Sequence, residues 1–124
     1  MSDRLVKFLS HVDMVKISCV ETTELVEEAR KLHGLNPTPT AAFGRVLTMA
    51  TMMGTMQKVE SEKITIQILG NGTLGTILVS ANSKGEVKGY VGNPLAEAEL
   101  NEAGKLNVTG GTLKATGEYI GFVD

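Results

Sequence analysis

The segment NPTPTAAFGRVLTMATMMGTMQK (36–58) most constrains what this chain can fold into, because apolar or small residues surround nearly its whole circumference. We expect a helix in which Thr38 is the N-cap and Pro39 takes the first helical position, where its missing N–H costs nothing. Arg45 and Gln57 are the main strongly polar exceptions. Such a helix is buried on most sides, so the other elements must be arranged around it.

The same segment approaches the length of about 20 residues that spans a membrane. An arginine near the middle of a span costs about 2.5–3.5 kcal/mol on insertion scales, and Arg45 takes such a position. We therefore predict a central helix of a soluble domain and no membrane partner.

A second helix is predicted by TTELVEEARKLHG (22–34), whose apolar residues form a stripe along one face. Thr23 is its expected cap, and Gly34 is expected to end it in the left-handed conformation. This helix can cover one side of the central helix.

Short β-type runs fill the remainder of the chain. LVKFLS and MVKISCV predict an N-terminal hairpin connected by residues 11–13, although apolar and polar residues alternate imperfectly in the first run. The expected strands are 5–10, 14–20, 63–69, 76–81, 86–91, 105–108 and 112–116. Strands, two helices and then strands is an α+β order, so we predict one α+β domain over residues 1–124 with a mainly antiparallel sheet.

A G-x-G-x-x-G motif, formed by Gly70, Gly72 and Gly75, follows an apolar, β-branched run. A dinucleotide-binding fingerprint requires a helix directly after the glycines and an Asp or Glu about 20 residues further on. Here the β-branched run TILVSA follows, and Tyr90 or Leu95 stands at that distance. We interpret the motif as a hairpin, with its Asn-Gly pair as a tight turn and its last glycine as a bulge or close backbone approach.

Composition argues against several functional classes. A net charge of −2 and a pI near 5.7, with scattered basic residues, argue against a nucleic-acid partner. Cys19 is the one cysteine and the N-terminus has no signal peptide, so we expect a cytoplasmic protein without disulfides. His11 and His33 each lack a partner spaced for catalysis or metal binding. We predict no catalytic residue, no cofactor and no metal site.

Methionines gather in the central helix. Met49, Met53 and Met56 follow the i, i+4, i+7 spacing of one helix face, and Met52 flanks them. They are interpreted either as a pliable core against the sheet or as an adaptable apolar surface for many clients. The pattern does not separate these two interpretations.

Five blocks of the sequence, in the same order, resemble one known family, the redox-regulated 33 kDa heat-shock chaperonins. They are TTELVEEARKLHG, AAFGRVLTMATMMG, KITIQILGNGTLG, GEVKGYVGNP and LNEAGKLNV, and the resemblance covers roughly residues 1–108. The string GYVGNP (89–94) is the most specific piece. The resemblance implies a cytoplasmic holdase of the stress response, whose α+β N-terminal domain binds unfolding proteins without ATP and pairs with a second copy when active.

The chain departs from that family in two ways. The family carries a C-terminal zinc module in which four cysteines sense oxidation, whereas this chain has only Cys19 and ends at Asp124. Residues 110–124 match the family's next strand only loosely, through GGTLKA. We therefore expect a fragment, or a divergent short relative, of the substrate-binding domain, with no zinc of its own.

Three hypotheses follow. The first is a holdase domain without catalytic residues that binds client proteins through an adaptable apolar surface, to which Met52, Met53 and Met56 contribute. The second is a structural dimerisation module that binds no client by itself. The third, and least favoured, is a nucleotide-binding enzyme that uses the turn at Gly70, Gly72 and Gly75.

Overall fold

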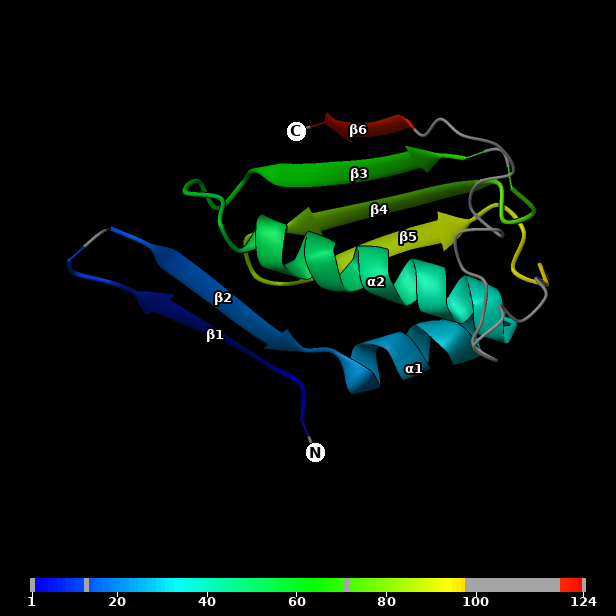
Figure 1. Ribbon diagram of the computed structural model, residues 1–124, viewed down its shortest axis with the longest axis horizontal. Coiled ribbons are helices and arrows are strands. Elements are labelled where there is room, and N and C mark those ends of the chain that lie inside the picture. Colours follow the sequence, from blue (N-terminus) through cyan, green and yellow to red (C-terminus); the bar gives the residue numbers. More distant parts are fainter. Residues whose placement is uncertain (1, 13, 71, 98–118, 124) are drawn as a thin grey trace.

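The computed structural model describes residues 2–12, 14–70, 72–97 and 119–123. A four-stranded sheet carries one long helix on one face, a second helix lies beside the first, and an N-terminal hairpin projects from them (Figure 1). The elements are β1 Arg4–Leu9, β2 Lys16–Glu21, α1 Thr23–His33, α2 Pro37–Gly54, β3 Lys63–Leu69, β4 Thr76–Asn82, β5 Val87–Val91 and β6 Tyr119–Val123. The predicted α+β fold is confirmed.

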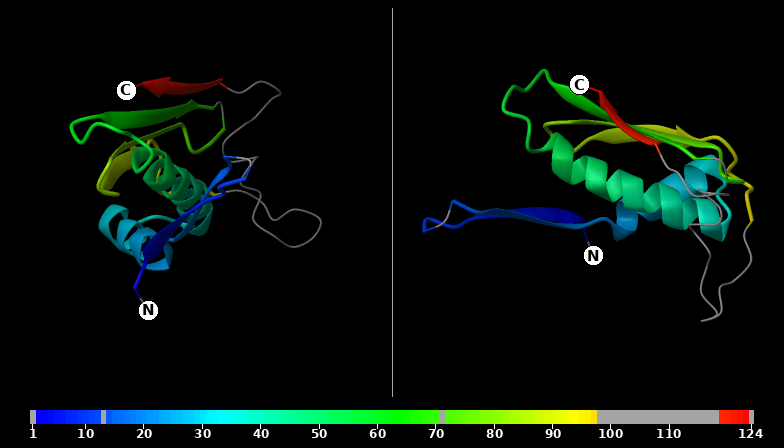
Figure 2. Two further views of the ribbon diagram at one scale, coloured as in Figure 1. Left: turned by 90° about the vertical axis from the view of Figure 1, so that its left-hand side faces the viewer. Right: turned by 45° about the horizontal axis from the view of Figure 1, so that its top comes forward.

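The sheet has the strand order β5-β4-β3-β6, and every neighbouring pair is antiparallel. β6 was not predicted, although YIGFV is rich in the aromatic and β-branched residues that favour strands. It pairs with β3 along the edge of the sheet (Figure 2). The strands expected at 105–108 and 112–116 lie outside the described residues.

The core forms between α2 and the inner face of this sheet. Ile66 pairs with Val79, and both side chains are buried, as the alternation of a half-buried strand requires. Phe43 and Leu47 of α2 belong to the same buried cluster. Close approach is possible because α2 has a glycine at Gly54, where a Cβ atom would come within 2.6 Å of the Asn82 carbonyl oxygen. The central position predicted for this helix is therefore confirmed.

The bounds and burial of α2 differ in part from the prediction. Asn36 is the N-cap and Pro37 the first helical residue, whereas Thr38, the predicted cap, is buried in the first turn. The fixed φ of Pro37 suits the first position as well as that of Pro39 does. The helix also has an open side, on which Met49 is 50% exposed.

The start of α1 also differs from the prediction. Thr22, not Thr23, is the N-cap, and its side chain makes no capping hydrogen bond. Instead, the carboxylate of Asp3 accepts the backbone N–H groups of Glu24 and Leu25 at 3.0 and 2.7 Å. The predicted stop is confirmed, since Gly34 is left-handed with φ of 62°.

The glycine motif connects β3 to β4, so the predicted hairpin is confirmed. Its turn is longer than expected, because the last ladder pair is Leu69 with Thr76 and residues 70–75 form the loop. Leu74 is fully buried, and its carbonyl oxygen accepts the N–H of Asn93 at 2.9 Å. Asn71 of the predicted tight Asn-Gly turn lies outside the described residues. A strand follows the loop where a nucleotide site would need a helix.

Candidate binding surface

The N-terminal hairpin, Arg4–Glu21, is called the arm from here on. Its strands pair in register from Arg4 with Glu21 to Leu9 with Lys16, so the connection spans residues 10–15 rather than the predicted 11–13. The far end of the arm extends past the end of α2 in Figure 1 and in the right view of Figure 2. The arm therefore offers two faces and a tip for contact.

The outer face of the arm is apolar and exposed. Val6 pairs with Cys19 and Phe8 pairs with Ile17, so these four side chains lie together on one face. Val6, Phe8 and Ile17 are 41%, 56% and 52% exposed, and Cys19 is exposed as well. Monomeric proteins rarely leave contiguous apolar side chains in water unless the surface is used for binding.

The tip of the arm continues this apolar surface. Leu9, Val12, Met14 and Val15 are all exposed. Met14 has a φ of 53°, a left-handed conformation that is uncommon for a residue other than glycine. We define the arm surface as the outer-face residues together with those of the tip: Val6, Phe8, Ile17, Cys19, Leu9, Val12, Met14 and Val15.

The inner face of the arm borders a groove at the C-terminal end of α2. Lys7 extends across to this end, where its ammonium group donates a hydrogen bond to the carbonyl oxygen of Thr55. The groove has a volume of about 380 Å³. Its walls are Lys7, Phe8, Leu9, Lys16, Ile17 and Ser18 of the arm with Thr55 and Met56.

The three predicted binding methionines do not form one surface. Met52 lines a shallow groove of about 370 Å³ between α1 and α2, together with Met49. Met53 packs against the hydrophobic core. Met56 is 56% exposed and lines the groove beside the arm. Their role in client binding stays a prediction, and the arm surface was not among the predicted sites.

The imperfect alternation of LVKFLS was the signal that could have drawn attention to the arm. A strand with one buried face alternates between apolar and polar residues, whereas β1 has apolar residues on both faces. A strand that no other element covers on either face leaves both faces exposed. The same pattern is typical of a strand that is covered on both faces, so it marks β1 as unusual without identifying a projecting ribbon.

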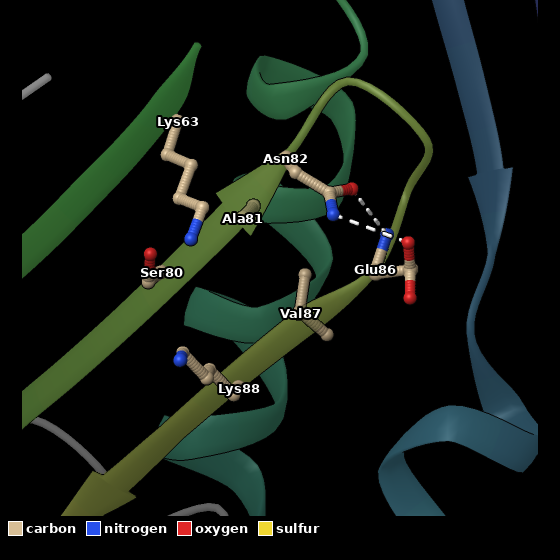
Figure 3. Close-up of a pocket in the computed structure, with 7 residues that line it drawn as sticks. All are labelled: Lys63, Ser80, Ala81, Asn82, Glu86, Val87 and Lys88. Atoms are coloured by element: carbon tan, nitrogen blue, oxygen red, sulfur yellow. Dashed lines mark hydrogen bonds between the residues drawn. The ribbon is translucent and has the colours of Figure 1, made fainter. Parts of the chain in front are cut away.

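A further pocket lies on the polar outer face of the sheet (Figure 3). Its volume is about 260 Å³, and its lining includes Lys63, Ser80 and Lys88. The Asn82 amide beside it holds the β4–β5 turn, since its oxygen accepts the N–H of Lys84 and of Glu86 at 3.0 and 3.1 Å. The polar groups of this turn thus have a structural function.

The described residues offer little catalytic chemistry. No group of three or more His, Cys, Asp or Glu within them could hold a metal ion. The zinc module of the resembled family needs four thiolates, and one exposed cysteine does not supply that donor set. His33 instead places its ring edge-on against Phe43, with 5.5 Å between the centroids. Neither helix in the described part of the chain has the length and apolar character of a membrane span.

An ion pair with shifted pKa values lies on the surface of α1. Arg30 donates hydrogen bonds to both carboxylate oxygens of Glu27, at 2.8 and 2.6 Å. These bonds lower the pKa of Glu27 and raise the pKa of Arg30. Because the pair is solvent-exposed, it supports the helix only weakly and is no sign of catalysis.

Known proteins resemble this chain in sequence and in structure. The family model for "Hsp33 protein" matches residues 3–124. The "33 kDa chaperonin" of Clostridium perfringens is 50% identical over 109 residues, which are 87% of this chain and 34% of that protein. The "33 kDa chaperonin" of Geobacillus kaustophilus is 51% identical over 108 residues, covering 87% of this chain and 36% of that protein.

A solved structure is also similar. The crystal structure of the 33 kDa chaperonin from Thermotoga maritima superposes with a TM-score of 0.82 at 31% identity, covering 96% of this chain and 44% of that one. The chain thus spans about a third of the length of the curated relatives it matches. Residues 110–124, whose sequence resembles the family only loosely, fall within the family match. With nearly every residue matched, the chain belongs to the Hsp33 family.

Proposed function

We propose that this chain is a holdase domain that binds unfolding proteins without ATP and keeps them from aggregating. The relatives are named chaperonins, which supports chaperone activity. The arm surface is the observation that carries the proposal, because it presents contiguous apolar side chains that no described element covers. Covering such a surface is favourable by about 25 cal/mol for each Å² of apolar area removed from water.

The proposed surface is adaptable in two respects. Met14 at the tip and Met56 beside the inner face are exposed, and methionine fits apolar partners of many shapes. The arm is also a two-stranded ribbon, a structure that is only marginally stable by itself and can adjust to a partner. We propose clients, not nucleic acids or membranes, as partners, and a cytoplasmic location. No cofactor or catalytic step is part of this proposal.

The test is suppression of light scattering by a thermally unfolding client protein. A double variant, Phe8→Ser with Ile17→Ser, removes apolar area from the outer face and is expected to lose most of the protection. Leu32→Ser is the matched control, because Leu32 is 77% exposed but lies on α1. Circular dichroism establishes that all variants are folded. Equal protection by the double variant and the control would contradict the assignment to the arm.

A structural dimerisation module is the second candidate function. It is favoured by the arm itself, since each of its two strands has an edge that is unpaired among the described residues. Sedimentation at several concentrations distinguishes the two. A dimer that gives no client protection would support the module, whereas protection by the chain supports the holdase. The nucleotide-binding alternative has no such observation in its favour, because β4 follows Gly75 directly.

A further inference from the structure

The groove on the inner face of the arm has apolar walls. Leu9 pairs with Lys16 on the same face of the arm as Lys7, and it lines the groove together with Met56, which follows the end of α2. Phe8 and Ile17, whose side chains lie on the outer face, also border the groove. Three of these residues also belong to the arm surface, so the groove and that surface are continuous. A client segment lying on the arm therefore has a recess into which a few side chains can be inserted.

The charged side chains that line the groove are positive. Lys7 and Lys16 line it, and no carboxylate of a described residue is among its lining. The ammonium group of Lys7 is already bonded to the Thr55 carbonyl oxygen, where it meets the negative end of α2. Lys16 has no ion pair with any residue that the structure describes. Within the described part of the chain, the charge of Lys16 is therefore available to a partner at the rim of the groove.

We propose that this groove binds an extended, apolar client segment that has an aspartate or glutamate next to its apolar run. The volume of about 380 Å³ lies at the low end for ligand pockets, so it admits a few side chains but no folded surface. The edge strands of the arm offer unpaired backbone groups to a segment in extended form. Lys16 then selects for the acidic flank. This inference rests on the proposed holdase function and names its preferred substrate class.

The experiment uses the full chain and two fluorescein-labelled peptides. Both contain the same run of leucine, valine and phenylalanine, and one ends in two glutamates where the other ends in two lysines. Fluorescence anisotropy is expected to give tighter binding of the acidic peptide. Lys16→Glu should weaken its binding by about fivefold or more, since an attraction becomes a repulsion. Met56→Ser should weaken the binding of both peptides alike.

The matched control is Lys88→Glu, which makes the same charge change on the outer face of the sheet. If Lys16→Glu and Lys88→Glu have equal effects, only net charge matters and the inference is overturned. Equal affinity of the wild-type chain for both peptides overturns it too. So does loss of peptide binding in step with dimer formation, because a second copy would then occupy the groove.

Client protection, measured in parallel, separates the two proposals. Protection without preference for the acidic peptide leaves the holdase function standing and rejects the groove as its selective site. Absence of both protection and peptide binding rejects the holdase function itself.

Discussion

The helix–sheet body and the arm contain similar apolar residues, but the body buries them and the arm exposes them. Phe43 on α2 is 1% exposed and lies in the buried cluster, whereas Phe8 on β1 is 56% exposed. The body strands β3, β4 and β5 each have one face against α2, whereas the far end of the arm extends past the end of that helix (Figure 1). The difference shows that hydrophobicity alone does not place a residue in the core; a neighbouring element must also be there to cover it.

The two regions also differ in what stabilises them. The body rests on close packing between α2 and the sheet, whereas the arm depends on its own ladder and on a few polar contacts at its base. Those contacts are the Arg4–Glu21 ion pair, the hydrogen bond from Lys7 to Thr55, and the cap that Asp3 forms on α1. Substitutions should therefore be costly in the body and mild in the arm.

The largest effect is expected from two matched substitutions of phenylalanine. Phe43→Ala removes a fully buried ring and should lower the free energy of unfolding by about 3–5 kcal/mol. Phe8→Ala loses only a partly exposed pair with Ile17 and should cost less than about 1 kcal/mol. Urea denaturation followed by circular dichroism measures both. Similar losses for the two variants would show that the ring of Phe8 is covered and that the comparison is wrong.

A smaller effect should come from the junction between the two regions. Asp3→Ala removes the carboxylate that accepts the N–H groups of Glu24 and Leu25, so about 1 kcal/mol of stability should be lost. Ser2→Ala is the neighbouring control and should change nothing measurable in the same urea experiment. An unchanged midpoint for Asp3→Ala would mean that the residue preceding the arm does not stabilise the body.

The smallest effect concerns the surface of the body and depends on pH. Hydrogen bonds from Arg30 lower the pKa of Glu27, so the ionised carboxylate is favoured in the folded state. The resulting stability is present above the ordinary pKa of glutamate and is lost as the pH falls through the folded-state pKa. Arg30→Gln should therefore be slightly less stable than the wild type at neutral pH and equal to it in acid.

Nuclear magnetic resonance titration of the Glu27 carboxyl gives the direct readout for that pair. Arg30→Gln should raise its pKa towards the ordinary value. Lys31→Gln is the control, because Lys31 lies 4.0 Å away and its charge is the weakest cause of the shift. A larger change with Lys31→Gln than with Arg30→Gln would contradict the hydrogen-bonded geometry.

Much of the body could be predicted because its elements are determined locally. The run KITIQIL alternates so clearly that β3 begins and ends where predicted, and Gly34 ends α1 for a purely backbone reason. The cap of α1 could not be predicted, because Asp3 is separated from Glu24 by the whole arm. The six-residue glycine loop depends likewise on contacts with Asn93, far along the chain.

The candidate surface was harder to predict than the fold. The helical spacing of Met49, Met53 and Met56 suggested one face, but α2 has neighbours on several sides and these divide the methionines among different surroundings. Sequence periodicity gives the direction of a side chain relative to its own element, not what lies opposite it. The exposed arm becomes visible only when the positions of the other elements are known.

Two of the polar contacts at the base of the arm have a mechanical consequence. Asp3 places a negative charge at the N-terminus of α1, and Lys7 places a positive charge at the C-terminus of α2. Each charge is therefore opposite in sign to the partial charge at that end of the helix dipole, which is favourable. These two electrostatic contacts hold the arm to the helices. A bound chain that pulls on the tip puts force on these contacts before it puts force on the packed interior, so the arm can move while the interior keeps its shape.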